Sequence, residues 1–241
     1  MARNDNRLLE RFFNTLISGD RDAARQIVDD AIEADYNGAT ILTHLFWPTL
    51  QQLQTMHRND QLSELAYHYA TRLLRHLQSQ LELRLPTPEQ RGSRVLLING
   101  DEASEELAGQ MACDLLEAAG YEVFYAGGGI ANDEIVAQLS ELDADKLVVF
   151  GAIPQTVPDT RLLIDRLHSI GACPDLQVIV GGGVFNRAEG LAEEIGADLW
   201  ANDPAELVET MVHDPGRRMD EDQRTVGRKR QQTKQSTANA A

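Results

Sequence analysis

A change of hydrophobic period at residues 86–93 is the feature that most constrains the fold. Before this segment apolar residues recur every three or four positions, as in amphipathic helices, whereas after it short apolar runs alternate with helix-like stretches. The segment itself, PTPEQRGS, is polar and contains two prolines, which is typical of a linker. We therefore expect an all-helical domain at 1–85 and an α/β domain at 94–214, joined by a linker at 86–93.

The first domain is predicted to be a four-helix bundle. Three helix starts are indicated by Asp20, Asn37 and Asp60, whose side chains can accept hydrogen bonds from free first-turn amides. Pro48 falls within the third helical pattern and should kink or divide it. The last helix carries an apolar stripe that we expect in the bundle core, made of Leu62, Leu65, Ala66, Tyr69, Leu73 and Leu77.

The second domain contains five short apolar runs that read as strands, at 95–98, 123–125, 147–150, 178–180 and 198–200. Because helix-like stretches separate them, they predict a doubly wound parallel sheet. Ligands bind such sheets at the carboxyl ends of the strands. The loops after Asn99, Tyr125, Phe150, Val180 and Trp200 are therefore the candidate site.

Charge and composition exclude several classes of protein. The formal net charge is −16, although the tail at 215–241 carries seven Lys/Arg against three Asp/Glu. An acidic body repels nucleic acid, whereas the polar tail, which we expect to be disordered, could bring Arg228, Lys229 and Arg230 to an anionic partner. The chain has no apolar run of about 20 residues and no secretory signal, which predicts a cytoplasmic protein. Cys113 and Cys173 are expected as reduced thiols.

Three stretches carry a resemblance to a known family. LISGDRDAARQIVDDAI and LSELAYHYATRLL resemble the start and the last helix of a cobalamin-binding cap, and GADLWANDPAELVE resembles the end of its sheet domain. The chain from Leu8 to Val212 thus resembles the cobalamin-binding module of methionine synthases, corrinoid carriers and B12-dependent photoreceptor regulators. The resemblance implies a flavodoxin-like domain with five strands, a helical cap and cobalamin between them.

The family's signature after the first strand, Asp-x-His-x-x-Gly, is only partly present. Asp101 matches, but Ala103 replaces the histidine that ligates cobalt from below, Ser104 follows it, and Glu106 replaces the glycine. Alanine cannot ligate cobalt, and Glu106 adds bulk and negative charge where the cofactor's nucleotide tail would pass. Together with Glu102 and Glu105, this carboxylate is also expected to stabilise a helix start.

The other two loops that the resemblance assigns to the nucleotide tail also differ. Gly151 and Ile153 flank an alanine where the family has Ser-x-Leu, so the hydroxyl that receives the tail's base is missing. The family's Gly-Gly after the fourth strand is retained within Gly181, Gly182 and Gly183.

The cap shows a similar partial match. His57 stands where photoreceptor-type members have a tryptophan above the corrin, and Tyr67 and His68 stand at their Glu-His pair. Neutral imidazole is a common metal ligand, so His57 is a candidate cobalt ligand from above, the alternative being a partly exposed histidine at a helix end. His68 lies off the leucine stripe and is predicted to face the domain interface.

Catalytic readings find little support. The third predicted strand ends in Phe150-Gly151 and not in the aspartate of a phosphoacceptor domain, and the sequence contains no phosphate-binding loop of the Gly-x-x-x-x-Gly-Lys type. Our first hypothesis is a non-catalytic sensory or regulatory protein of the cobalamin-binding type, with altered or lost corrinoid binding. It would act through a protein partner such as a transcriptional regulator, since no DNA-reading domain is apparent. The alternative is a corrinoid carrier subunit of a methyltransferase system.

Overall fold

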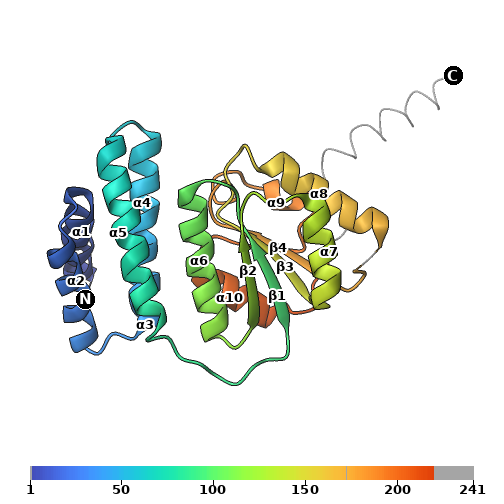
Figure 1. Cartoon of the computed structure of the whole chain (residues 1–241), viewed down its shortest axis with the longest axis horizontal. Coiled ribbons are helices and arrows are strands. Elements are labelled where there is room, and N and C mark those ends of the chain that lie inside the picture. Colours follow the sequence, from blue (N-terminus) through green and yellow to red (C-terminus); the bar gives the residue numbers. More distant parts are fainter. Residues whose placement is uncertain (1, 172, 220–241) are drawn as a thin grey trace.

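The computed structural model describes residues 2–171 and 173–219 and contains a helical half and a sheet half (Figure 1). The helical half comprises α1 (Ala2–Ser18), α2 (Arg21–Glu33), α3 (Gly38–Ile41), the π-helix η1 (Leu42–Phe46), α4 (Trp47–Arg58) and α5 (Glu64–Glu82). Because α3, η1 and α4 follow one another directly, they form the third arm of the predicted four-helix bundle. Pro48 is near the start of α4, just after the π-helix, so it lies where the helical run is divided, as predicted.

Two of the three predicted helix starts are confirmed. Asp20 accepts a hydrogen bond from Ala23 N at 3.0 Å, and Asn37 accepts one from Thr40 N at 2.8 Å. The third prediction is wrong, because Ser63 caps α5. Asp60 instead lies in the turn after α4 with a φ of 56°, a left-handed conformation that a short polar residue tolerates.

The predicted apolar stripe is wrong for two of its six residues. Leu73 and Leu77 are buried, but Leu65 is 62% exposed and Tyr69 is 47% exposed. The reason is the length of the neighbouring helix: α4 and α5 extend beyond the end of α1 (Figure 1), and the turn residue Gly19 lies against the Tyr69 ring. Leu65 therefore lies beyond the part of α5 that α1 covers.

The sheet half has the predicted α/β class. Its strands are β1 (Arg94–Ile98), β2 (Glu122–Gly127), β3 (Lys146–Phe150), β4 (Gln177–Gly181) and β5 (Leu199–Ala201). All pair in parallel in the order β2-β1-β3-β4-β5, the doubly wound arrangement expected from the sequence. The strand order reverses between β1 and β3, so the crevice at their carboxyl ends is the point where such sheets bind ligands.

Helices cover both faces of the sheet (Figure 1). α6 (Ala103–Ala118) and α10 (Pro204–His213) lie on the face toward the bundle. α7 (Asn132–Leu142), α8 (Val157–Ile170) and α9 (Leu191–Ile195) lie on the other face. The bundle therefore covers only one side of the sheet, the side of α6 and α10.

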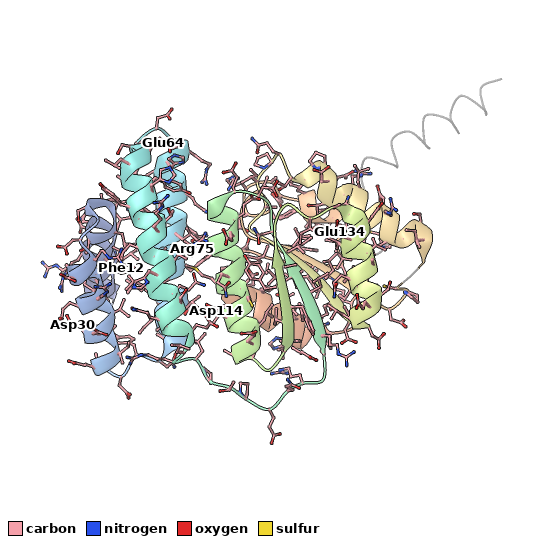
Figure 2. All side chains as sticks on the ribbon, viewed as in Figure 1. Phe12, Asp30, Glu64, Arg75, Asp114 and Glu134 are labelled. Atoms are coloured by element: carbon pink, nitrogen blue, oxygen red, sulfur yellow. The ribbon has the colours of Figure 1, made fainter. Side chains whose placement is uncertain are left out.

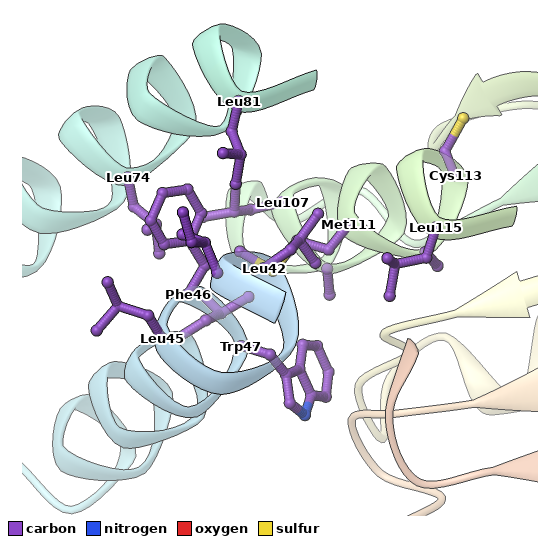
Figure 3. Close-up of a cluster of buried hydrophobic side chains, with 14 of the residues drawn as sticks. Leu42, Leu45, Phe46, Trp47, Leu74, Leu81, Leu107, Met111, Cys113 and Leu115 are labelled. Atoms are coloured by element: carbon purple, nitrogen blue, oxygen red, sulfur yellow. The ribbon is translucent and has the colours of Figure 1, made fainter. Parts of the chain in front are cut away.

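The two halves share one hydrophobic core. α4 and α5 both contact α6, and Phe46 and Trp47 from the bundle join Leu107 and Met111 of α6 in a single buried cluster (Figure 3). Because buried apolar area is the main source of stability, the bundle and the sheet domain stabilise each other.

The chain beyond α10 is described only as far as Met219. Gln177 Nε2 donates hydrogen bonds to the carbonyls of Asp214 and Arg217, at 3.0 and 2.9 Å. The first residues of the tail are thus held against β4 by the buried amide of Gln177. Residues 220–241, with the basic patch, lie outside the described residues. None of the helices in the described part is long and apolar enough to cross a membrane.

Candidate functional site

The side chain of Glu105 lies between the β1–α6 and β3–α8 loops, and a pocket of about 350 Å³ stays open at the carboxyl ends of β1 and β3. Glu105 has no exposed surface, and its carboxylate accepts hydrogen bonds from Glu102 N at 3.1 Å and Ile153 N at 2.9 Å. The Thr156 hydroxyl lies 3.4 Å from the same carboxylate. A Cβ atom on Gly100 would lie 2.2 Å from Glu105 Oε1, so the carboxylate reaches the backbone of the β1–α6 loop. Glu105 therefore ties this loop to the β3–α8 loop.

The charge of Glu105 is balanced between opposing effects. Burial raises the pKa of this carboxyl, whereas the hydrogen bonds from the Glu102 and Ile153 amides lower it, and the net direction is upward. The expected role in stabilising the start of α6 is confirmed for Glu105 by its bond to Glu102 N. Its contact with Ile153, on the other loop, was not anticipated.

Glu105→Gln is expected to lower the free energy of unfolding by about 1–3 kcal/mol. The amide has one acceptor oxygen in place of two, so its NH2 group would face a backbone N–H or the Thr156 hydroxyl. The neighbouring Glu106→Gln is the matched control. Its side chain is 49% exposed, and the expected loss is below about 1 kcal/mol. Urea unfolding monitored by circular dichroism measures both, and equal losses would contradict the role given to Glu105.

The ring of Phe150 fills a second space, above the glycines that follow β4. Phe150 is fully buried, and a Cβ on Gly181 would lie 2.7 Å from its Cε2 atom, while one on Gly182 would lie 3.0 Å from its Cε1 atom. On its other side the ring contacts Trp47 of the bundle, with ring centroids 5.8 Å apart. The third glycine, Gly183, has a φ of 55° and lies against the Ala152 carbonyl. These glycines allow close packing within the protein itself.

Asp101 lies at the rim of the site. Its side chain is exposed and lines a hollow of about 490 Å³ between the ends of β1 and β2, together with Glu106 and Tyr125. Ala103 and Ser104 open α6, and their side chains are not among those described. The identity of Ala103 alone excludes an imidazole at this position.

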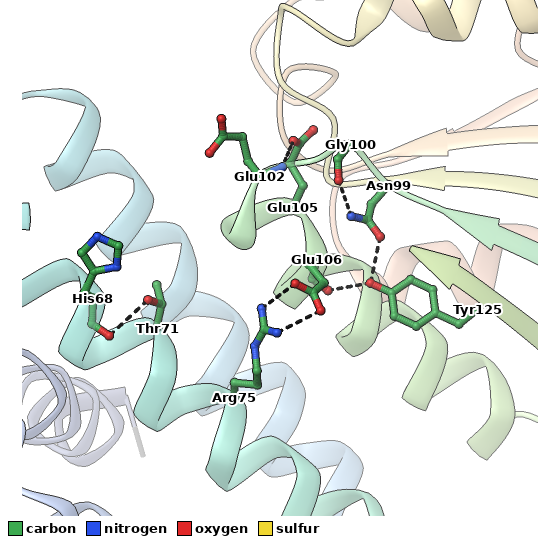
Figure 4. Close-up of polar contacts among 9 residues, drawn as sticks. All are labelled: His68, Thr71, Arg75, Asn99, Gly100, Glu102, Glu105, Glu106 and Tyr125. Atoms are coloured by element: carbon green, nitrogen blue, oxygen red, sulfur yellow. Dashed lines mark hydrogen bonds and ion pairs between the residues drawn. The ribbon is translucent and has the colours of Figure 1, made fainter. Parts of the chain in front are cut away.

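A polar contact joins the bundle to α6 beside this hollow (Figure 4). Arg75 of α5 donates two hydrogen bonds to the Glu106 carboxylate, both 2.9 Å long. The Tyr125 hydroxyl lies 2.8 Å from both the Glu106 carbonyl and Asn99 Oδ1. Glu106 thus pairs with a cation of the bundle where the resemblance would place the nucleotide tail.

The cap residues form a separate group at the α4–α5 turn. His57 stacks on Tyr67 with centroids 4.0 Å apart, and its Nε2 lies 2.9 Å from Glu64 Oε1. His68 Nε2 lies 3.8 Å from the other Glu64 oxygen, and the side chain is 60% exposed. Within the described residues no group of three or more His, Cys, Asp or Glu side chains is arranged to hold a metal ion.

The structure thus brings the predicted residues into two groups. Gly151, Ile153 and the three glycines at the end of β4 meet at the carboxyl edge of the sheet, whereas His57, Tyr67 and His68 lie at the end of the bundle. Sequence reasoning missed Phe150 and Trp47 as site residues. Phe150 could have been identified from its place at the end of β3, opposite Gly181 in the sheet register, but this pairing is visible only in three dimensions.

Family models match both halves of the chain. One model, described as a B12 binding domain, matches residues 94–209, and a second with the same description matches residues 8–82. The chain belongs to the B12-binding family. The resemblance to cobalamin-binding modules found in the sequence is therefore confirmed for both the cap and the sheet domain.

Curated relatives of this B12-binding chain are named corrinoid proteins. Dimethylamine corrinoid protein 1 of Methanosarcina acetivorans is 26% identical over 115 residues, which span 47% of this chain and 53% of the relative. A corrinoid protein of Desulfitobacterium hafniense is 32% identical over 124 residues, or 50% of this chain and 55% of the relative. The chain thus matches only about half the length of these relatives.

A solved structure agrees in fold. The monomethylamine corrinoid protein of Methanosarcina barkeri superposes with a TM-score of 0.75, covering 87% of this chain and 99% of the other, at 13% identity. This likeness supports the combination of helical cap and doubly wound sheet.

The residues of this B12-binding chain do not fit a corrinoid held in the way the resemblance implies. The lower histidine is replaced by Ala103, Glu105 joins the β1–α6 loop to the β3–α8 loop, and Phe150 covers Gly181 and Gly182. All three differences affect the lower ligand and the nucleotide tail. They leave the exposed rim around Asp101 accessible.

Proposed function

We propose that this chain is a corrinoid-binding subunit that works with a methyltransferase partner and catalyses no reaction itself. The observation that carries the proposal is the presence of both family domains in one chain, and its relatives are named corrinoid proteins. This reading corresponds to the alternative drawn from the sequence, and the relatives' names favour it over a sensory role. A bound corrinoid would supply cobalt-centred methyl chemistry, which the side chains lack.

The side chains of the described residues support a binding role and not a catalytic one. Cys113 is buried, and burial raises the pKa of its thiol, which keeps it protonated and unreactive. The ion pair between Arg75 and Glu106 connects the bundle to the sheet domain. This contact helps to hold the two halves in a fixed arrangement.

The cofactor is proposed to keep its own base on cobalt, because position 103 offers no imidazole. His57 remains the candidate for the opposite face of the metal. His57 Nε2 lies 2.9 Å from Glu64 Oε1, so Nδ1 would be the ligating atom, and the carboxylate would orient the ring through the Nε2 proton.

The test is the visible spectrum of the purified protein after incubation with hydroxo-, methyl- and adenosylcobalamin and removal of free ligand. We expect corrin absorbance at about one equivalent, with the spectrum of cobalamin that retains its base. A spectral difference between the protein and His57→Ala would place that histidine on cobalt. His76→Ala, which changes a half-buried histidine farther along α5, is the control. Colourless protein with all three forms would overturn the proposal.

A second candidate is a regulator that binds no corrinoid and acts on a protein partner such as a transcriptional regulator. The observation that favours it is the Phe150 ring over Gly181 and Gly182, together with Ala103 at the ligand position. Colourless protein in the same experiment, followed by capture of a partner that is not a methyltransferase, would support this second function. Contact between the basic tail and an anionic partner stays a proposal, because the basic residues lie outside the described part of the chain.

A further inference from the structure

We infer that Phe150 occupies the place where this family receives the base of the nucleotide tail, so that this chain selects corrinoids by the ring and not by the tail. The inference rests on the proposed function and specifies its ligand. It makes Phe150 a specificity-determining residue, for which the sequence resemblance assigns no role.

The first step is the position of the ring. The resemblance assigns the tail's base to the loops after β3 and β4, where the chain keeps its glycines. In the structure the Phe150 ring edge lies over both glycines, where Cβ atoms on Gly181 and Gly182 would be 2.7 and 3.0 Å from it. An aromatic side chain of the protein therefore stands where an aromatic base would have to enter.

The second step is that the ring cannot easily move aside. Phe150 is fully buried and belongs to the cluster that joins the bundle to α6, with the Trp47 ring against it. Turning it out would expose an aromatic side chain to water and leave a cavity beside Trp47, which is as unfavourable as removing the side chain. Tail entry could not recover this energy without new contacts.

The third step is that the neighbouring entrance is also closed. Gly151 lies against α6, where a Cβ atom would be 3.0 Å from Ala108 Cβ and 3.1 Å from the Glu105 carbonyl. Glu105 also bonds Ile153 N across the two loops. A tail would therefore meet backbone and a buried carboxylate before it reached Phe150.

The consequence is a ligand preference that can be measured. If the nucleotide tail stays outside the protein, it adds no binding affinity. Cobinamide, which lacks the tail, should therefore bind as tightly as cobalamin. Bound cobalamin should keep its base on cobalt at neutral pH.

The experiment titrates the full-length protein with aquocobalamin and with diaquocobinamide, followed by equilibrium dialysis and visible spectra. We expect dissociation constants within about threefold of each other. Cobalamin that binds more than tenfold tighter, with the spectrum of a released base, would overturn the inference while supporting the proposed function.

The variant Phe150→Ala tests the residue directly, with Phe150→Leu as the control that keeps most of the bulk. Phe150→Ala should raise the preference for cobalamin over cobinamide at least tenfold and shift bound cobalamin toward the base-released spectrum, and Phe150→Leu should not. An unchanged preference in Phe150→Ala would contradict the role of the ring. Should Phe150→Ala not fold, the titration of the unaltered protein decides the inference.

The two proposals fail in different ways. If the unaltered protein binds neither corrinoid, the proposed function is overturned. Selection by the ring falls with it, but the closure of the tail site by Phe150 is still supported if Phe150→Ala gains cobalamin binding, and is contradicted if that variant also stays colourless.

Discussion

Trp47→Ala is expected to lower the free energy of unfolding by about 3–5 kcal/mol, the usual cost of truncating a large buried aromatic side chain. Trp47 is 6% exposed and contacts Phe150 from the bundle side. It follows the π-helix directly and lies in the cluster shared with α6, as Figure 3 shows. The cavity left by alanine would therefore weaken the contact between the two halves as well as the bundle.

The measurement is urea unfolding followed by circular dichroism at helix wavelengths. Trp200→Ala is the matched control, because the second tryptophan of the chain is 36% exposed and has Arg217 over its ring at 5.3 Å. Its expected loss is about 1 kcal/mol. We also expect Trp47→Ala to broaden or split the unfolding transition, because the halves would no longer unfold together. Equal losses for the two variants would contradict the coupling of the halves through Trp47.

The strands were predictable because each is a short apolar run between polar or glycine residues. Four predicted runs lie wholly inside observed strands, and the fifth, at 198–200, is displaced by one residue because Asp198 precedes β5. Asp198 instead accepts a hydrogen bond from Val178 N at 2.7 Å. Local pattern identifies a strand well, but its end depends on how the neighbouring backbone is bonded.

The capping residue of α5 and the burial of its apolar residues could not be predicted from local sequence pattern. Both Asp60 and Ser63 are good capping residues, and the choice between them depends on the turn that connects α4 to α5. Likewise, Leu65 and Tyr69 continue the helical period of Leu73, but their burial depends on where α1 ends. An amphipathic pattern identifies the face of a helix, whereas the length of its neighbour decides how much of that face is covered.

The candidate site was predicted as a set of loops and not as a set of contacts. The loops at the carboxyl ends of β1, β3 and β4 do meet, because parallel strands bring these ends to one edge. The occupation of that edge by Glu105 and Phe150 was not foreseen. Glu105 looks like a helix-start acid in sequence, and its bond to Ile153 joins positions 48 residues apart. Phe150 looks like ordinary strand core until Gly181 is placed opposite it.

A buried carboxyl group at the bundle contact leads to the second large prediction, which concerns pH. Asp114 of α6 is 1% exposed and accepts hydrogen bonds from Gln78 of α5 at 2.9 Å and Gln110 at 2.8 Å. Figure 2 shows Asp114 on α6, on the side toward the bundle. Burial raises the pKa of Asp114 to about 6, the two glutamines lower it, and the charges of Glu82 and Glu117 raise it.

The sign follows from the proton that the folded state retains. An unfolded aspartate has a pKa of about 3.9, so between about pH 4 and pH 6 the folded protein binds more protons at Asp114 than the unfolded chain. The contribution of Asp114 to stability therefore falls as the pH rises through this window and is constant above it. A shift of this size corresponds to a loss of roughly 3 kcal/mol.

Asp114→Asn should remove this loss, making the variant more stable than the unaltered protein at pH 7.5 by about 1–3 kcal/mol and nearly equal to it at pH 4. The uncharged amide carries no cost of burying a charge, and its NH2 group can donate to Gln78 Oε1, which has no hydrogen-bond partner among the described residues. Urea unfolding at pH 4, 5, 6 and 7.5 measures the difference. Asp133→Asn, on a side chain that is 69% exposed, should leave the pH dependence unchanged. A difference between Asp114→Asn and the unaltered protein that stays constant from pH 4 to 7.5 would show that folding does not raise the pKa of Asp114, and that the contact between α5 and α6 carries its negative charge without penalty.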